Sequence, residues 1–144
     1  MAHDNQYDNE NIFAKIIRGE MPCTKVYEDE HTIAFMDVMP QAEGHTLVLP
    51  KEPARDLLEL SGEAATNLIL SVQKVARAVD DAFQPDGVMI VQYNREAAGQ
   101  TVFHIHMHIV PRWDGVPLKR HSDGMADAAV LEERAAKIRA ALAG

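Results

Sequence analysis

The middle of the chain has the clearest helical periodicity. Ser61 is a good N-cap, and the apolar residues after it recur at i, i+4, i+7, i+11 and i+15, which predicts a helix that runs to about Phe83. The residues of this stripe are Leu68, Val72, Val75, Val79 and Phe83. Three further helices are predicted, over residues 12–17, over residues 54–60 and in the Ala-rich segment after Met125. In this last helix the apolar residues that can dock on a core are Val130, Leu131, Ile138 and Leu142.

Short apolar runs predict five strands. The runs cover residues 25–28, 32–38, 44–50, 87–94 and 104–110. An acidic turn at Asp29–Glu30 joins the first two as a hairpin, Pro50 ends the third, and Pro111 ends the last. Strands joined as hairpins, with the helices elsewhere in the chain, predict an α+β fold with a mainly antiparallel sheet.

The last predicted strand carries a histidine at every second position. His104, His106 and His108 alternate with apolar residues, so one face of the strand is predicted to be apolar and the other to hold three imidazoles. Placed at random, the 7 histidines of the chain would form such a run about 0.02 times. The triple therefore indicates a functional site. We expect His3, His31 and His121 to be ordinary surface or hydrogen-bonded residues.

Two kinds of chemistry fit this row. A neutral imidazole can attack an electrophile while its neighbours donate hydrogen bonds to an extended anion. Alternatively, two neighbours such as His104 and His106 could share a metal ion, and all three could reach one ion only if the strand bent sharply.

The loop before the histidines is suited to a phosphate. Gly99 lets the backbone approach a ligand closely, and Gln100 and Thr101 offer an amide and a hydroxyl donor. Asn94, at the end of the preceding predicted strand, can point into the same cleft. The alternative is an ordinary turn.

Composition narrows the class of protein. A length of 144 residues predicts one domain, and a net charge of −8 argues against a nucleic-acid polymer as partner, although a single nucleotide is compatible with it. The single cysteine, Cys23, forms no disulfide within the chain and no thiolate cluster. Since the sequence has neither a signal-peptide pattern nor an apolar run of about 18 residues, we expect a cytoplasmic protein without a membrane partner.

The sequence "HIHMHIV" at 104–110 matches the His-φ-His-φ-His-φ-φ pattern of the HIT (histidine triad) superfamily. The segments at 11–51 and 94–112 resemble the two halves of its histidine-triad nucleotide-binding branch, bacterial type. This resemblance implies a HIT-like fold, with a five-stranded antiparallel sheet, two main helices and an extra C-terminal helix. It also implies a homodimer. The domain division expected is a disordered tail at 1–10, a HIT domain at 11–113 and a partly helical extension at 114–144 that packs on the domain or dimer.

The same resemblance implies a purine nucleoside 5'-phosphoramidase that binds an AMP-like ligand and needs no metal or other cofactor. His106 would attack phosphorus and form a covalent nucleotidyl-histidine. His108 and His45 would contact the phosphate or tune its surroundings, His104 would orient the nucleophile, and Gln100 and Thr101 would hold phosphate oxygens or the leaving group. Asn94 would make a further contact on the phosphate side.

The resemblance also implies a nucleoside pocket. Asp37 would bind the ribose hydroxyls, although a turn-capping role before Pro40 fits its position nearly as well. The apolar walls around the base would be Ile12, Phe13, Ile16, Phe35 and Val38.

Departures from the family pattern leave alternatives open. Asn11 and Ala14 stand where some bacterial relatives carry a Cys-x-x-Cys that helps to bind a structural zinc, so that site is absent. Thr101 stands where relatives often have serine, and the segment after Arg112 differs, which leaves the leaving group undefined. A dinucleoside polyphosphate hydrolase, or a nucleotide-binding regulatory protein with incidental hydrolysis, therefore remains an alternative.

Overall fold

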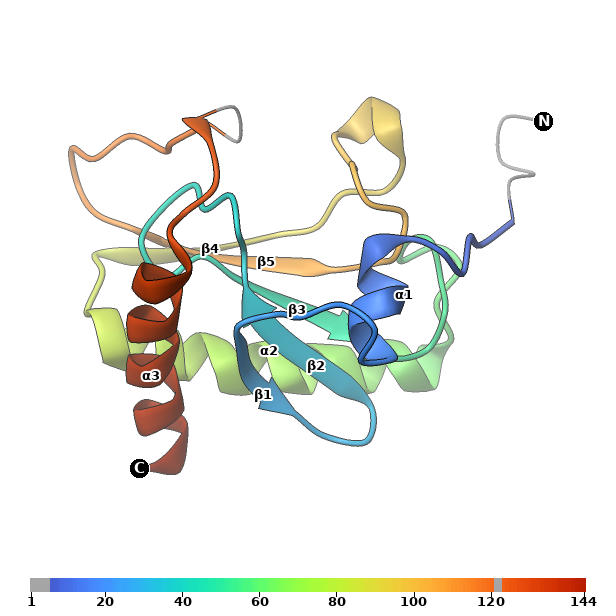
Figure 1. The fold of residues 1–144 in the computed structure, drawn as a ribbon, viewed down its shortest axis with the longest axis horizontal. Coiled ribbons are helices and arrows are strands. Elements are labelled where there is room, and N and C mark those ends of the chain that lie inside the picture. The colour runs from blue at the N-terminus through green and yellow to red at the C-terminus, as the bar shows by residue number, and fades with distance from the viewer. Residues whose placement is uncertain (1–5, 121–122) are drawn as a thin grey trace.

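The computed structural model describes residues 6–120 and 123–144. Its centre is a five-stranded antiparallel sheet with the strand order β1-β2-β3-β5-β4 (Figure 1). The strands are β1 (Lys25–Glu28), β2 (Thr32–Met36), β3 (Thr46–Pro50), β4 (Gly87–Val91) and β5 (Met107–Arg112). The helices are α1 (Ile12–Ile17), α2 (Gly62–Phe83), α3 (Ala128–Ala143) and a 3-10 turn, η1 (Glu96–Ala98). The predicted α+β class and antiparallel sheet are confirmed.

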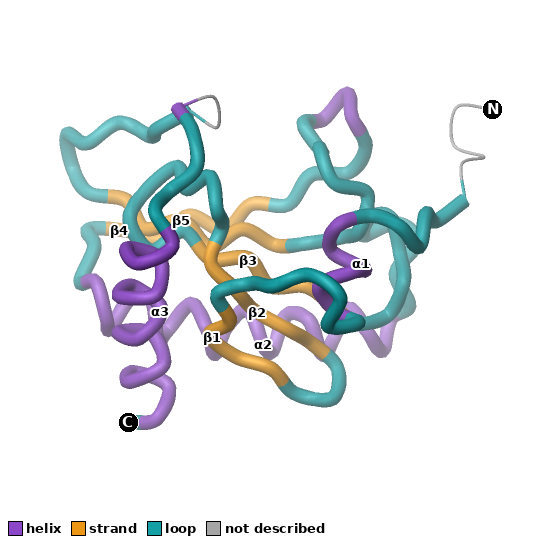
Figure 2. Tube along the Cα trace, viewed as in Figure 1, coloured by secondary structure: helices purple, strands orange, loops and turns teal. Residues whose placement is uncertain are grey.

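The strands divide the apolar residues between two faces. Alternate residues of a strand point to opposite sides, so Ala34 and Met36 join α2 and α3 in one cluster, while Ile33 and Phe35 join α1 in the other. Helix α2 crosses one face of the sheet, and α1 lies on the opposite side with the loops that precede β5 (Figure 2). His108 pairs with Leu47, a member of the α1 cluster, so the imidazole row and α1 share a face.

The predicted long helix is confirmed, together with its cap. The Ser61 hydroxyl accepts a hydrogen bond from the Ala64 N–H at 3.1 Å, and the helix ends at Gln84, which has a left-handed conformation (φ 49°). Its stripe from Leu68 to Val79 is buried in the main core. The predicted short helix over 54–60 is wrong: this segment forms turns, because the Asp56 carboxylate accepts hydrogen bonds from the N–H groups of Leu58 and Glu59 and competes with helix formation.

The histidine strand differs from the prediction at both ends. It begins at Met107, because the Ile105 N–H donates to the Ala54 carbonyl at 2.9 Å instead of joining the sheet. His104 and His106 therefore lie in an extended segment before β5. The strand also continues through Pro111 to Arg112. β3 accompanies β5 only as far as Ile109, and a residue without an N–H is tolerated where one neighbouring strand is missing.

The C-terminal helix covers one edge of the sheet. Leu131, Ala135 and Ile138 of α3 are buried against the core, whereas Val130, also predicted to be available for docking, remains 37% exposed. The Arg139 guanidinium donates to the Lys25 carbonyl of the edge strand β1 at 2.9 Å. Among the residues that the structure describes, no helix combines the length and the apolar character needed to cross a bilayer.

Candidate active site

Backbone carbonyls hold the first two histidines of the row. The Nε2 of His104 lies 2.8 Å from the Pro50 carbonyl oxygen, and the Nδ1 of His106 lies 2.7 Å from the His104 carbonyl oxygen. A carbonyl can only accept, so both of these nitrogens carry hydrogen. In neutral rings, the lone pairs are then on Nδ1 of His104 and on Nε2 of His106.

Burial keeps these two rings neutral. Desolvation lowers the pKa of His104 to about 4, and it also lowers the pKa of His106. The backbone hydrogen bonds oppose these shifts without cancelling them. At neutral pH, His106 therefore presents an unprotonated Nε2, which is the nucleophilic form of imidazole.

The Nδ1 atom of His104, which has the lone pair, contacts a residue of the N-terminal segment. The Tyr7 hydroxyl lies 2.6 Å from His104 Nδ1, and the two rings meet edge to face with their centroids 5.6 Å apart. Tyr7 belongs to the segment expected to be a disordered tail, and the sequence pattern contains no signal for this contact.

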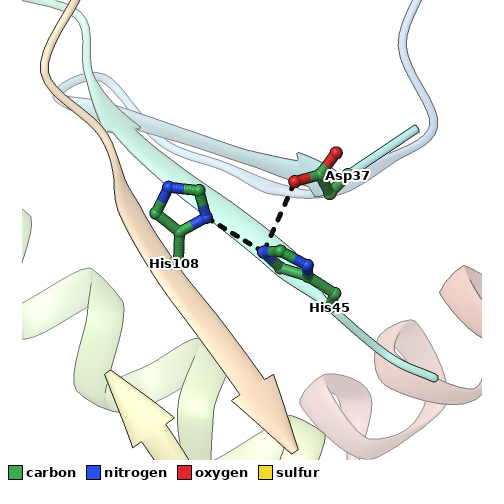
Figure 3. Close-up of side chains that lie close together, drawn as sticks. All are labelled: Asp37, His45 and His108. Carbon is green, nitrogen blue, oxygen red and sulfur yellow. Dashed lines mark hydrogen bonds and ion pairs between the residues drawn. The ribbon is translucent and has the colours of Figure 1, made fainter. Parts of the chain in front are cut away.

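The third histidine belongs to a different network, with His45 and Asp37 (Figure 3). The Gln41 N–H donates to His45 Nδ1 at 3.0 Å, so a neutral His45 carries its hydrogen on Nε2. That nitrogen lies 2.9 Å from His108 Nδ1 and 3.4 Å from a carboxylate oxygen of Asp37. His108 Nδ1 is then an acceptor, which leaves the hydrogen of a neutral His108 on Nε2.

Asp37 has the turn-capping role that was considered for it, and it also faces His45. Its Oδ1 accepts a hydrogen bond from the Met39 N–H at 2.8 Å, which is the turn-capping role, and its Oδ2 faces His45. The carboxylate is 6% exposed, at the end of β2.

These three side chains also have the donor set of a metal site. One ligand atom from each of Asp37, His45 and His108 lies within 4.8 Å of the others. In a tetrahedral zinc site, bonds of about 2.0–2.1 Å put neighbouring ligand atoms roughly 3.3 Å apart. The two imidazole nitrogens, at 2.9 Å, are closer than that and have the geometry of a shared proton.

The loop before the triad is held together by its own polar side chains. The Gln100 amide donates to the carbonyls of Arg55 and Val102 and accepts from the Arg95 N–H, and Gln100 is 2% exposed. The Asn94 side chain accepts from the Leu57 N–H at 3.0 Å. Gly99 has φ 109°, and a Cβ there would lie 3.3 Å from the Tyr93 ring, so this glycine is required by the fold. Thr101 differs from the other side chains predicted to donate from this loop. It is exposed, and among the described contacts its side chain does not hold the loop together.

Comparison with known proteins agrees with this geometry. A family model described as the HIT domain matches residues 18–115. The chain belongs to the HIT domain family. Among its relatives, Protein hit of Bacillus subtilis is 46% identical over 117 residues, which are 78% of this chain and 81% of that protein. The adenosine 5'-monophosphoramidase hnt1 of Schizosaccharomyces pombe is 40% identical over 70% of this chain and 73% of its own length.

The solved structures include a HIT-like protein from Bartonella henselae that contains an unknown ligand. It is 52% identical, with a TM-score of 0.89, and the match covers 94% of this chain and 99% of that one. The HIT-like fold expected from the sequence is thereby confirmed.

In this HIT domain, three residues of the expected apolar wall form a cluster beside His106. Phe13 meets His106 edge to face at 4.9 Å between centroids and meets Phe35 at 5.6 Å, and Ile16 packs in the same cluster. Ile12 and Val38 are 46% and 44% exposed. Two of the five expected wall residues are thus exposed, and three are buried.

Sequence patterns missed several contacts of the HIT site. Tyr7, the Gln41 N–H and the Tyr93 ring, which meets His108 edge to face at 5.6 Å, lie in irregular segments. His31 is exposed beside Glu30, in line with the ordinary role expected for it. His3 and His121 lie outside the described residues.

Proposed function

We propose that this HIT-domain protein is a purine nucleoside 5'-phosphoramidase that forms a covalent nucleotidyl-His106. The observation that carries the proposal is the state of His106: it is neutral, its Nδ1–H is held by the His104 carbonyl, and its Nε2 has the lone pair. The relationship to a protein named adenosine 5'-monophosphoramidase supports this choice of substrate class.

In the first step, the Nε2 lone pair of His106 forms a bond to the α-phosphorus. The phosphorus–nitrogen bond to the leaving amine breaks, and the amine departs with the electron pair and takes up a proton from solvent water. The nucleotidyl-imidazole is cationic, because its Nδ1 keeps a hydrogen. The His104 carbonyl at 2.7 Å stabilises that positive charge through the same hydrogen bond.

In the second step, water attacks phosphorus, the bond to Nε2 breaks, and His106 recovers its lone pair while the attacking water releases a proton to solvent. His108 supports both steps. Its ring centroid lies 5.0 Å from that of His106, and its Nε2–H is a donor for a phosphoryl oxygen. Thr101 contributes a hydroxyl donor from the loop.

The nucleoside is assigned to the side of α1. Asp37 accepts the ribose hydroxyls, and the base packs against the exposed side chains of Ile12 and Val38 and the buried cluster of Phe13, Ile16 and Phe35. Asn94 and Gln100 act on the phosphate indirectly, by bracing the loop that holds Thr101.

The test is AMP release from adenosine 5'-phosphoramidate, with diadenosine tetraphosphate as the competing substrate. We expect the phosphoramidate to be preferred by wild type, no turnover by His106→Ala, and wild-type turnover by the control His31→Asn, which changes an exposed histidine. A preference for the dinucleotide would transfer the proposal to a polyphosphate hydrolase. Tight AMP binding without turnover of either substrate would favour a binding protein.

We also propose a homodimer formed through β4. This strand is an edge of the sheet, whereas the opposite edge, β1, is covered by α3. Ile90 on β4 is 41% exposed, and Ile69 and Leu70 on α2 are 53% and 58% exposed. An uncovered apolar edge strand is a template for pairing. Sedimentation of wild type as a dimer and of Ile90→Lys as a monomer is expected, and a monomeric wild type at micromolar concentration would contradict the proposal.

A further inference from the structure

We propose that Tyr7 is a positioning residue of the triad, which fixes the ring of His104 in one orientation and through it sets the orientation of His106. The inference rests on the proposed role of His106 as nucleophile. Tyr7 lies outside residues 18–115, the part of the chain that matches the HIT domain. The contact that carries the proposal is the 2.6 Å hydrogen bond between the Tyr7 hydroxyl and His104 Nδ1.

The direction of this hydrogen bond follows from the other end of the ring. His104 is fully buried, and its Nε2–H is committed to the Pro50 carbonyl. Nδ1 of the neutral ring therefore has no hydrogen, so the Tyr7 hydroxyl must donate. Burial raises the pKa of Tyr7, which keeps the phenol protonated at neutral pH and able to donate.

Tyr7 is itself held in place by a short folded segment. The Asn11 side chain donates to the Asp8 carbonyl at 2.7 Å. The Arg18 guanidinium donates to the Asn9 carbonyl, also at 2.7 Å. Asn11 in addition caps α1 through the Ala14 N–H. The segment that carries Tyr7 is thus fastened to the same helix that supplies Phe13 to the site.

Two successive hydrogen bonds connect the Tyr7 hydroxyl with the ring of His106. The Tyr7 hydroxyl and the Pro50 carbonyl hydrogen bond to the two different nitrogens of the His104 ring. A flipped ring, or the other tautomer, would not satisfy both of these partners. The backbone carbonyl of the same residue holds His106 Nδ1. Without the phenol, a buried nitrogen loses its donor, and the segment from His104 to His106 loses one of its two side-chain anchors.

Tyr7 also lies between two residues that line a cavity next to the loop before the triad. Its neighbours Gln6 and Asp8 line a cavity of about 560 Å³, together with Gln100 and Phe103 on either side of Thr101. The N-terminal segment therefore borders the loop that leads into the histidines, and Tyr7 fastens it there.

The experiment compares Tyr7→Phe with Tyr27→Phe. Both variants remove one phenol hydroxyl that bonds a side chain, and the Tyr27 hydroxyl bonds Asp29 at 2.9 Å in the β1–β2 turn. The first readout is the tautomer of His104 and His106, from two-bond nitrogen–proton NMR correlations of the imidazoles. The second is kcat and KM for adenosine 5'-phosphoramidate.

In Tyr7→Phe we expect His104 to keep the Nε2–H that the Pro50 carbonyl requires, with shifted His104 Nδ1 and His106 resonances. We also expect a kcat about tenfold lower with KM nearly unchanged, since a slightly displaced nucleophile loses rate more than binding. Tyr27→Phe should match wild type in its imidazole resonances, its kcat and its KM. Wild-type spectra from Tyr7→Phe, or an unchanged kcat with an active enzyme, would overturn the inference.

If the proposed function is wrong, the same experiment gives a different set of results. In that case wild type itself has no turnover, and the NMR readout alone decides: altered His104 and His106 resonances in Tyr7→Phe support the positioning role, and unaltered ones overturn it. A lower melting temperature with unaltered imidazole resonances would show that Tyr7 is merely structural, which also overturns the inference.

Discussion

The two ends of the histidine row are held by different kinds of partner. His104 and His106 lie before β5 and bond to backbone carbonyls, which cannot change their protonation. His108 lies on β5 and bonds to His45, whose other close neighbour is the Asp37 carboxylate. The first pair is fixed in one neutral state, whereas the second network consists of titratable groups.

This difference suggests a division of labour. A nucleophile benefits from a fixed tautomer and a lone pair that is never protonated, and carbonyl partners with desolvation provide both. A group that responds to the charge developing on a phosphate benefits from partners that can share a proton. Mutations at the two ends should therefore differ in size and in pH dependence.

The largest effect on kcat is expected at the fixed end of the histidine row, which consists of His104 and His106. His106→Asn should lower kcat for adenosine 5'-phosphoramidate by about 10⁴-fold or more, because it removes the proposed nucleophile. AMP affinity, measured by calorimetry, should change little. Single-turnover trapping of a nucleotidyl-protein should succeed with wild type and fail with this variant. A trapped adduct on His108 in either protein would reverse the assignment of the two ends.

A smaller loss of kcat is expected at the proton-sharing end of the row, which consists of His108 with His45 and Asp37. His45→Leu removes the donor to His108 Nδ1 and should lower kcat by about 10²-fold, since His108 remains but loses its fixed tautomer. His45→Gln places an amide N–H near the position of Nε2 and should recover part of the rate.

This pair of variants separates hydrogen bonding from packing at a fully buried position. Equal rates for His45→Leu and His45→Gln would show that His45 only fills space, and that His108 works without the network.

The sequence predicts the fold better than it predicts these partners. Periodicity identified the α2 stripe, because burial of one helix face acts on every third to fourth residue. Short apolar runs identified β2 and β3, whose residues are buried on both faces. The β5 boundary failed because alternation continues through His104–His106 although the chain has left the sheet there, with Ile105 bonded to Ala54. Periodicity reports burial, and a buried irregular segment has the same pattern as a strand.

Site residues divide in the same way. The triad was recognisable from its spacing, and Asp37 from its place in an apolar run. Tyr7 and the Gln41 N–H were not, because a contact across 97 positions has no local pattern, and a backbone N–H has no sequence signature. Gln100 was expected to face the phosphate, yet its amide is committed to three backbone groups of the loop.

The fixed end should also make stability depend on pH. The folded-state pKa of His104 is about 4, below the ordinary value of 6.5, so the unfolded chain binds a proton first as the pH falls. This group therefore destabilises the fold progressively between about pH 6.5 and pH 4 and has no effect above that range. We expect the free energy of unfolding to be about 2 kcal/mol lower at pH 5 than at pH 7 from His104 alone. His106, whose pKa is also lowered, adds to the loss.

Urea denaturation at the two pH values measures this effect. His104→Gln should flatten the dependence, whatever its own stability, and the exposed control His31→Asn should leave it as in wild type. A pH dependence that survives His104→Gln undiminished would locate the titrating group elsewhere.

The smallest expected effect concerns metal chelation, and it tests whether the two ends differ as described. Among the described residues, the donor set Asp37, His45 and His108 has its two imidazole nitrogens in hydrogen-bond contact at 2.9 Å, while Tyr7 and Pro50 occupy both nitrogens of His104. Excess EDTA should therefore change phosphoramidate turnover by less than about twofold. Loss of activity on chelation, restored by zinc in wild type but not in Asp37→Asn, would make the proton-sharing end a metal centre. The nucleophile at the other end would then be acting on a metal-bound phosphate.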